Sequence, residues 1–516
     1  MRANHAVLST QDGPTVYPDT IVTQPLTRKT GEKYRRSHQV VACPDALLAN
    51  AHATQARPPA ATTHVEINVD PRTTSRRTFL GLAMGVPLAG ALAACGSSGP
   101  SSSTSSGSAG AAGSGASYWY LTGQPGEGIR KGAVDRFNAA NPSTQIAQTA
   151  FQNDAYKTKI KTALGAGQAP TIIWGWGGGG LKSWVDASQV EDLTSWFGEN
   201  AAVKDKLFPS SFGAATVGGK IYAMPCETVQ PIVLYYNKSV FEKVGVQPPT
   251  SWDDIMALVP KFNAQGIAPF SLGGQSRWTN MMWLEFLFDR IGGPEVFQAA
   301  FEGQKDAWSN PDAITALTKV QDLVKANGFI KGFSSITADS NADQALLYTG
   351  KAAMMLHGAW TYGSMKNDGG DFVKGGHLGW MNFPPVAGGK GDPSNTVGNP
   401  GQYLSISSKA TAAEKETAKK FFTTGVLDAT EVKAWIDTGS IPIVKGADSN
   451  IGTSEDAEWL KFLYEVSAGA KVFAQSWDQA LPPSAAETLL DNIAKLFQLS
   501  ITPEQFATNL NAVTNS

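Results

Sequence analysis

Residues 117–174, SYWYLTGQPGEGIRKGAVDRFNAANPSTQIAQTAFQNDAYKTKIKTALGAGQAPTIIW, carry the pattern that decides the fold. Aromatic and β-branched runs predict three strands, at 117–121, 145–151 and 171–174. Between them, apolar residues recur at helical spacing over 128–140 and 154–164. This β-α-β-α-β alternation predicts an α/β body with a largely parallel sheet.

The folded body is too long for a single core. Core-forming sequence begins near Tyr118 and leaves about 400 residues, beyond the size at which one core keeps growing, so we expect two lobes. All 14 Trp lie in this body, at or after Trp119. The net charge of −2 and the lack of a basic block argue against nucleic acid as a partner.

An export signal precedes the body. Ser75-Arg76-Arg77-Thr78-Phe79-Leu80 is followed by an apolar run that ends in Leu92-Ala93-Ala94-Cys95. We interpret 71–94 as a twin-arginine lipoprotein signal peptide and Cys95 as its lipidated cysteine, since the run is too short and too rich in Gly and Ala to span a bilayer stably. This places the protein at the extracellular face of the cytoplasmic membrane, held by a lipid anchor.

Two segments around the signal are expected to lack a core. Residues 95–117 are rich in Ser and Gly and predict a flexible linker. Residues 1–70 show neither a helical nor a strand period, and we interpret them as an over-extended start or a disordered leader.

Cysteine and histidine are scarce in the body. Cys226 is its only cysteine beyond Cys95, which excludes a disulfide framework and a cysteine-based zinc site. The two remaining histidines, His357 and His377, are expected to be structural or at the surface. The pair Tyr235-Tyr236 invites a ferric-ion site, but neighbouring strand residues point to opposite faces. No metal and no cofactor are therefore expected.

A series of short motifs in the body resembles extracellular solute-binding protein family 1, the sugar-binding lipoproteins of ABC importers. The motifs are Gly-Lys-Ile-Tyr-Ala-Met-Pro (219–225), Leu-Tyr-Tyr-Asn-Lys (234–238), Phe-Glu-Lys-Val-Gly-Val (241–246), Pro-Pro-Thr-Ser-Trp-Asp-Asp (248–254), Gly-Lys-Ala-Ala-Met-Met (350–355) and Gly-Ala-Trp (358–360). Their order and spacing carry the resemblance, which covers about 118–516. Three further stretches, at 119–125, 174–176 and 476–483, are similar to actinobacterial xylobiose-binding proteins.

The resemblance implies an α/β fold of the two-lobe periplasmic-binding-protein-like type (type II), with a hinge and a cleft between the lobes. It also implies a monomer, not an enzyme, that captures an oligosaccharide by lobe closure and delivers it to ABC permease subunits in the membrane. Xylobiose or another xylo-oligosaccharide is the expected ligand. Two alternatives stay open: a secreted glycoside hydrolase, for which Glu227 and Asp478 are the carboxylates to consider, and a binder of a non-sugar small solute.

Sugar recognition selects the candidate ligand residues. The C–H faces of a sugar stack on aromatic rings, and its hydroxyls need polar partners, so we looked for both types in loops. The candidates are Gln124, Trp176, Glu227, Arg277, Trp278, Trp360, Gln402, Trp477 and Asp478.

Other tryptophans and the lobe boundaries complete the expectations. Five tryptophans are expected to pack in the core or against it: Trp119, Trp174, Trp196, Trp252 and Trp283. The glycine run 175–180 follows a buried strand, where we expect it to let a ligand approach the backbone. The predicted N-lobe comprises 118–230 and 385–438, and the predicted C-lobe comprises 231–384 and 439–516.

Overall fold

The computed structural model describes residues 115–514, which all lie in one compact unit, Ser103–Ser516. The predicted signal peptide, the lipidation site at Cys95 and nearly all of the predicted linker lie outside the described residues. Within 115–514, every helix is too short or too polar to cross a lipid bilayer.

The first sheet is built from the stretch that opened the sequence analysis. Its strands, in spatial order, are β2 (Ile146–Phe151), β1 (Ala116–Leu121), β3 (Ile172–Gly175), β12 (Gln402–Ile406) and β6 (Met224–Cys226). β1 pairs in parallel with β2 and β3, whereas β12 is antiparallel to β3 and β6. The predicted α/β alternation is confirmed, and the sheet is parallel in the half that this alternation builds.

Helices cover the first sheet and close its core. They are α1 (Gly126–Ala140), α2 (Asn153–Gly165), α3 (Gly178–Asp186), α4 (Thr194–Glu199), α5 (Ala201–Lys206), α13 (Ala412–Thr424) and α14 (Ala429–Asp437). A 3-10 turn (Pro209–Ala215) and the small hairpin of β4 (Thr216–Val217) and β5 (Lys220–Ile221) join them. α13 begins with a capping box, because Thr411 and Glu414 each accept a hydrogen bond from the other's backbone N–H.

The second sheet is organised around one long strand, β7 (Thr228–Asn237). Its spatial order is β14 (Phe473–Gln475), β11 (Thr396–Asn399), β7, β9 (Ala352–Gly358) and β8 (Ala268–Phe270), and β10 (Leu378–Met381) and β13 (Ile441–Pro442) also pair with β7. Both faces of β7 are buried, in different apolar clusters: Ile232 and Leu234 belong to one, Val233 and Tyr235 to the other. A strand covered on both faces reads as a continuous apolar run, as this one does. Tyr235 and Tyr236 therefore point to opposite faces.

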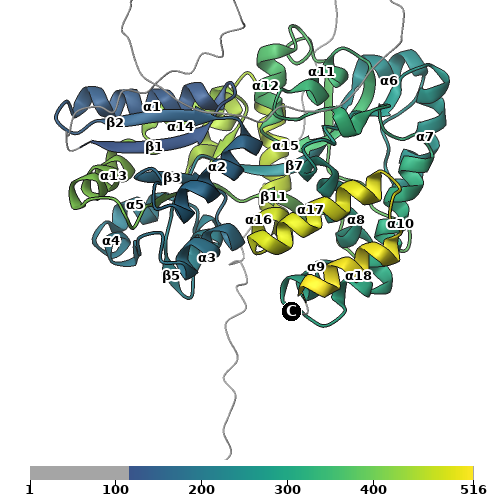
Figure 1. The fold of residues 1–516 in the computed structure, drawn as a ribbon. Coiled ribbons are helices and arrows are strands. Elements are labelled where there is room, and N and C mark those ends of the chain that lie inside the picture. Colours follow the sequence, from purple (N-terminus) through teal and green to yellow (C-terminus); the bar gives the residue numbers. More distant parts are fainter. Residues whose placement is uncertain (1–114, 515–516) are drawn as a thin grey trace, which may run out of the picture. The chain divides into compact units, whose positions relative to one another are not determined.

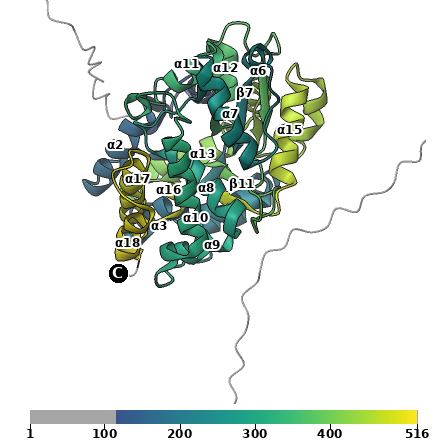
Figure 2. The same ribbon diagram turned by 90° about the vertical axis from the view of Figure 1, so that its right-hand side faces the viewer.

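The helices of the second body are α6 (Lys238–Val244), α7 (Trp252–Ala264), α8 (Trp278–Gly292), α9 (Glu295–Phe301), α10 (Pro311–Lys325), α11 (Ala342–Tyr348), α12 (Thr361–Asp368), α15 (Ala457–Ala468), α16 (Trp477–Ala480), α17 (Pro483–Phe497) and α18 (Pro503–Thr514). Short 3-10 turns lie at Ala307–Ser309, Phe333–Ser335 and Ala447–Thr453. α7 begins with a side-chain cap, because the Ser251 side chain accepts from the backbone N–H of Asp254. Figure 2 shows α7, α8 and α10 in front of this sheet.

Three chain crossings connect the two sheets, and Figure 1 shows β7 leading from the first body into the second. The first crossing lies between β6 and β7, the second between β11 and β12, and the third near β13. β7 pairs with both β11 and β13, so the crossings lie side by side. The second crossing falls at Pro400-Gly401 rather than near 385, because β11 pairs with β7 and β14 and thus belongs to the C-lobe.

The glycine run after β3 serves packing between chain segments. A Cβ on Gly177 would collide with the carbonyl oxygen of Ala214, and one on Gly179 would collide with the carbonyls of Ala480 and Leu481. The Gln475 side chain also donates to the carbonyl oxygen of Trp176 (2.8 Å). The expected approach of a ligand to these glycines is thus replaced by a close contact between the N-lobe and the segment around α16. We call this contact, 176–179 against 475–481, the glycine seam.

Candidate ligand-binding site

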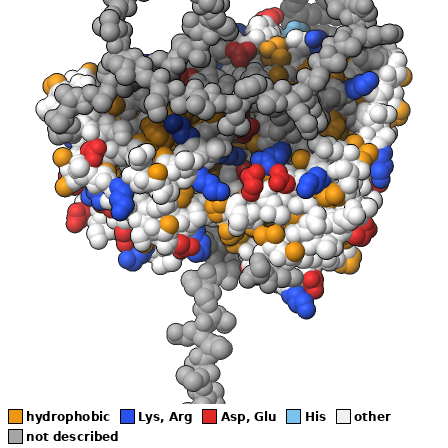
Figure 3. All heavy atoms as spheres, viewed as in Figure 1, with side chains coloured by type: hydrophobic (Ala, Val, Ile, Leu, Met, Phe, Trp, Pro, Cys, Tyr) orange, Lys and Arg blue, Asp and Glu red, His pale blue; other side chains and the backbone are white. Residues whose placement is uncertain are grey.

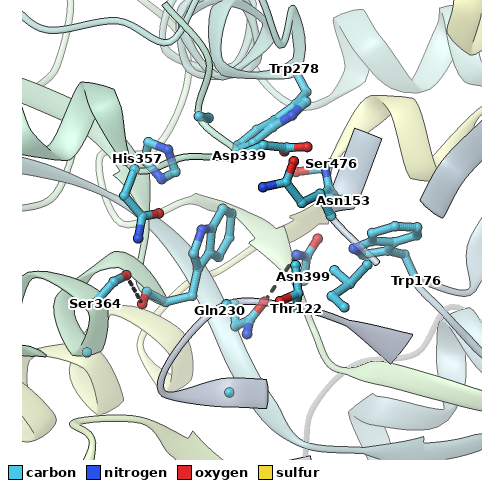
Figure 4. Close-up of a pocket in the computed structure, with 18 of the residues that line it drawn as sticks. Thr122, Asn153, Trp176, Gln230, Trp278, Asp339, His357, Ser364, Asn399 and Ser476 are labelled. Carbon is cyan, nitrogen blue, oxygen red and sulfur yellow. Dashed lines mark hydrogen bonds between the residues drawn. The ribbon is translucent and has the colours of Figure 1, made fainter. Parts of the chain in front are cut away.

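A cavity of about 220 Å³ lies between the two lobes. The N-lobe contributes the loop after β1, the start of α2 and the end of β3, and the C-lobe contributes the start of α8, the loop before α11, the end of β9 and α16. Side chains from both lobes converge on this space (Figure 4). Ligand sites commonly form at such junctions, and here the first sheet presents the carboxyl ends of its parallel strands.

Five tryptophans line the cavity: Trp174, Trp176, Trp278, Trp360 and Trp435. Trp174 lies in β3 and Trp176 lies just after its end, and their ring centroids are 4.7 Å apart with the planes at 82°. Trp278 and Trp360 face each other on the C-lobe side, 6.1 Å apart. Gly358 makes room for the Trp360 ring, since a Cβ there would overlap it. The cavity thus offers two aromatic surfaces, one from each lobe.

A buried ion pair lies behind the N-lobe tryptophans. Arg130 donates from Nε and Nη2 to the two carboxylate oxygens of Glu227, at 2.8 Å each, and Trp174 Nε1 donates to Oε1 (2.6 Å). Burial disfavours the charged guanidinium, but the ion pair and hydrogen bonds with Glu227 outweigh it and raise the pKa of Arg130. Glu227 lies at the first crossing with a φ of 61°, so this pair ties the hinge to the cavity wall.

Two polar contacts bridge the lobes at the cavity. Lys157 of α2 forms an ion pair with Asp478 of α16, with Nζ 3.0 Å from Oδ2. The backbone N–H of Asp154 donates to Asp339 Oδ2 (3.0 Å). The Lys157 ammonium also lies 5.1 Å from the ring centroid of Trp176, within cation–π range. The two bridges connect α2 to α16 and to the loop before α11 in the C-lobe.

His357 is fixed at the end of β9. Its Nδ1 accepts from the backbone N–H of Gly358 (2.9 Å), so Nδ1 carries no proton and Nε2 carries it. Nε2 faces the buried carboxylate of Asp343, 3.3 Å from Oδ2. The imidazole meets the rings of Trp278 and Trp360 edge-on, at 5.4 Å from each. His357 was expected to be structural or at the surface; it is buried, and it also lines the cavity.

Several buried polar atoms in the cavity wall lack a protein partner. Among the described residues that line it, these atoms are Trp278 Nε1, Asp339 Oδ1, Gln344 Oε1, His357 Nε2, Asn399 Oδ1 and Gln479 Oε1. A buried polar atom without a hydrogen bond costs about 1 to 3 kcal/mol. A polar ligand that reached these atoms would recover that cost, so they are candidate hydrogen-bonding positions for a ligand.

Five of the nine predicted ligand residues line the cavity: Gln124, Trp176, Trp278, Trp360 and Asp478. Trp360 occupies the strand-to-helix turn between β9 and α12. Trp278 is the first residue of α8 rather than part of a loop. The structure therefore brings these five side chains together from five separate regions of the chain.

The other four lie outside the cavity wall, for different reasons. Glu227 stands behind Arg130, and Gln402 stands behind the lining residue Gln230, to which its Nε2 donates (2.6 Å). Arg277 has a φ of 59° that turns it away from Trp278, and it pairs with Glu487 and Asp491 on α17. Trp477 is buried against Phe297, with the rings stacked 4.2 Å apart.

Several lining residues were not expected from the sequence. Trp174 was expected to be a packing residue; it is buried, but it also lines the cavity. The charged residues Arg130, Lys157 and Asp339 were not singled out, and neither were Gln344, Asn399 and Trp435. Asn399 precedes Pro400-Gly401 at a crossing, a signal that could have found it. Asp339 lies in an irregular polar segment that no local pattern links to a cavity.

Comparison with known proteins agrees with this architecture. Residues 121–428 match the family model for bacterial extracellular solute-binding proteins. A solved structure from work on xylan utilization by the thermophilic bacterium Caldanaerobius polysaccharolyticus has a TM-score of 0.70 and 32% identity over 77% of this chain and 99% of that one. A chitin oligosaccharide binding protein has a TM-score of 0.70 at 24% identity, over 78% of this chain and 98% of that one.

A curated relative agrees as well. A probable sugar-binding periplasmic protein of Mesorhizobium japonicum is 31% identical over 43% of this chain and 52% of its own length. The chain spans about half the length of the first curated relatives that it matches, from 51% to 56%.

The fold is that of a two-lobe protein, with a cavity between two α/β bodies that three chain crossings connect. The family match covers more than half of the chain. The chain belongs to the bacterial extracellular solute-binding protein family.

Proposed function

We propose that this protein captures an oligosaccharide between its lobes and delivers it to ABC permease subunits in the membrane, with xylobiose or another xylo-oligosaccharide as the expected ligand. One observation carries the proposal: tryptophan rings from both lobes enclose a cavity whose wall also holds six unpartnered polar atoms. Aromatic faces suit the C–H faces of sugar rings, and the polar atoms suit the hydroxyls.

The expected sugar class draws on the relatives. The structure from work on xylan utilization shares 32% identity with this chain over 99% of that structure's chain and 77% of this one. This similarity supports the xylo-oligosaccharide expectation. A curated relative in Streptococcus mutans is described as a multiple sugar-binding protein. Sugars of other series therefore belong in the test.

A binder of small anions is less well supported. Such a site needs a free guanidinium or ammonium group, but Arg130 is held by Glu227 and Lys157 by Asp478. Arg277, the other candidate clamp, pairs with two carboxylates outside the cavity.

Calorimetry tests the proposal. The protein is titrated with xylo-, cello-, malto- and galacto-oligosaccharides, and tryptophan fluorescence is followed in parallel. We expect micromolar or tighter binding of at least one xylo-oligosaccharide, with a change in fluorescence and no release of xylose from xylobiose. Released xylose would favour the glycoside hydrolase. Failure of every sugar to bind would overturn the proposal, and preference for another series would correct the ligand.

We also propose that the chain is exported as a monomeric lipoprotein, with 71–94 as its twin-arginine signal and Cys95 as its anchor. This rests on the sequence motif, since these residues lie outside the described part. Labelled palmitate should enter the protein in cells and should not enter the Cys95→Ala variant. Equal labelling of both proteins would exclude this anchor.

A further inference from the structure

The charged side chains of the cavity wall do not balance. Among the described residues, the charged groups that line it are Arg130, Lys157, Asp339 and Asp478. Arg130 pairs with Glu227, and Lys157 pairs with Asp478. Asp339 forms no ion pair within 4.0 Å, although Lys157 lies close enough to act on it electrostatically. Asp343, which faces His357 behind the wall, is a further carboxylate, so the wall and its pairing partners hold four carboxylates, Glu227, Asp339, Asp343 and Asp478, against the cations Arg130 and Lys157.

Asp339 is the carboxylate without an ion pair that itself lines the cavity. Its Oδ2 is used by the backbone N–H of Asp154, whereas its buried Oδ1 has no hydrogen-bond partner. Figure 4 shows the carboxylate next to Trp278 and across from Asn153. Burial raises the pKa of Asp339 and the neighbouring Asp154 carboxylate adds to this, whereas the backbone N–H of Asp154, the Lys157 ammonium and the Asn153 side chain lower it.

Most of the lining atoms without a hydrogen bond are acceptors, which also favours a ligand that donates hydrogen bonds. Four of them accept hydrogen bonds: Asp339 Oδ1, Gln344 Oε1, Asn399 Oδ1 and Gln479 Oε1. Two donate, Trp278 Nε1 and His357 Nε2, and the second of these already faces the Asp343 carboxylate. A matching ligand must supply hydrogen-bond donors. A sugar hydroxyl does so, whereas a carboxylate accepts only.

We propose that this cavity selects uncharged sugars and rejects sugars that carry a carboxylate, and that Asp339 is the residue that imposes this selection. The inference rests on the proposed function and narrows its substrate class from oligosaccharides to those without uronic acid groups near Asp339. Rejection follows from like charge at short range and from the loss of a donor for Oδ1.

The test compares one ligand in two charge states. An acidic xylo-oligosaccharide with a single glucuronic acid group and its methyl ester have nearly the same shape, but only the acid is charged at pH 7. By calorimetry, we expect the acid to bind the wild-type protein at least about tenfold more weakly than the ester. In Asp339→Asn, whose amide oxygen can still accept from Asp154, the ratio should fall to within about threefold.

Asp154→Asn is the matched control. This neighbouring carboxylate lies outside the cavity wall, and its backbone contact to Asp339 does not need its side chain. The acid-to-ester ratio should stay at its wild-type value. An equal effect of Asp154→Asn would assign the selection to general charge and overturn the role of Asp339.

The two proposals fail differently. If neutral sugars bind but the acid binds the wild-type protein as well as the ester does, the inference is wrong and the proposed function stands. If no neutral sugar binds, the proposed function is wrong and the inference falls with it. The wild-type ratio needs no variant, so a folding defect in Asp339→Asn would still leave it measurable. Added salt should reduce that ratio, because it screens charge repulsion.

Discussion

The two walls of the cavity differ in whether their buried polar atoms have hydrogen bonds within the protein. On the N-lobe wall, the buried polar groups of Arg130 and Trp174 are satisfied within the protein by Glu227. On the C-lobe wall, all six unpartnered lining atoms are found, from Trp278 to Gln479. The N-lobe wall thus presents polar groups that already have hydrogen bonds within the protein, and the C-lobe wall presents polar atoms that have none.

This difference separates two tasks of a binding site. A satisfied wall holds its aromatic rings in place before the ligand arrives, which lowers the entropic cost of binding. At a wall whose polar atoms lack hydrogen bonds, each hydrogen bond from the ligand contributes more to the binding free energy, because it removes the cost of an unpaired buried atom. We expect substitutions in the N-lobe wall to change mainly stability and those in the C-lobe wall to change mainly affinity. Figure 3 shows Lys and Arg side chains interspersed with Asp and Glu on one face of the molecule. We therefore attribute the expected changes in stability and affinity to contacts at the cavity and not to a large electrostatic field at the surface.

The largest effect is expected from Glu227→Gln. This change leaves the guanidinium of Arg130 buried without its counter-charge and should lower the free energy of unfolding by about 3 to 5 kcal/mol. Chemical denaturation measures it. The exposed pair of Lys182 and Asp186 is the control, and Asp186→Asn should change stability by at most about 0.5 kcal/mol. A loss below 1 kcal/mol in Glu227→Gln would show that the N-lobe wall does not depend on this pair.

Glu285 has a buried carboxylate oxygen without a hydrogen bond and does not line the cavity, so it shows how such an atom affects stability alone. It accepts from the backbone N–H of Trp477 (2.7 Å), its Oε2 has no partner, and burial raises its pKa to about 8. The folded protein therefore holds a proton that the unfolded chain loses near pH 4.3, and this contribution to stability is lost as the pH rises toward 8.

In Glu285→Gln that loss is absent. Relative to wild type, the variant should gain about 2 to 4 kcal/mol in the free energy of unfolding between pH 5 and pH 8. Denaturation curves at both pH values measure the difference. Parallel pH profiles of the two proteins would contradict the prediction and assign the proton elsewhere.

Trp360→Ala tests the aromatic part of the C-lobe wall. Removing the ring should weaken binding of the best panel sugar by about 30- to 100-fold, or about 2 to 3 kcal/mol, because it takes away one stacking surface. Trp360→Phe should recover part of the affinity. Trp119 packs against Phe151 away from the cavity, so Trp119→Ala should bind the sugar normally. Unchanged affinity in Trp360→Ala would exclude stacking on this ring.

The smallest effect is expected from Arg277→Ala. The guanidinium pairs with Glu487 and Asp491, both more than half exposed, and such surface pairs contribute about 0 to 1 kcal/mol. Sugar affinity should stay within about twofold of wild type, as measured by calorimetry. A tenfold loss would place Arg277 in the site and contradict the division into two walls.

The fold was more predictable than the site, for physical reasons. The strands and helices between 117 and 174 follow from local periodicity and end within about two residues of their predicted limits. The crossing near 400 was misplaced because β11 is recognised only by its partners, β7 and β14. Pairing between distant strands leaves little trace in a single sequence.

The site depends on direction as well as on residue type. Arg277 and Trp278 are neighbours, yet only Trp278 lines the cavity, because a positive φ at Arg277 separates their directions. Trp477 and Asp478 divide in the same way, one into the core and one into the cavity. Residue chemistry selected the right loops, but local sequence does not say which side chain of a pair faces inward.

The glycine seam has a practical consequence for watching the protein move. Because α16 packs closely on α3, although it follows a strand of the second sheet, the segment 475–481 is shared between the lobes. Fluorescent or spin labels on α3 and α16 would follow local sliding at this contact. Labels on α1 and α10 each lie within one lobe's own helical layer, and their separation is the coordinate that a ligand-induced closure should change.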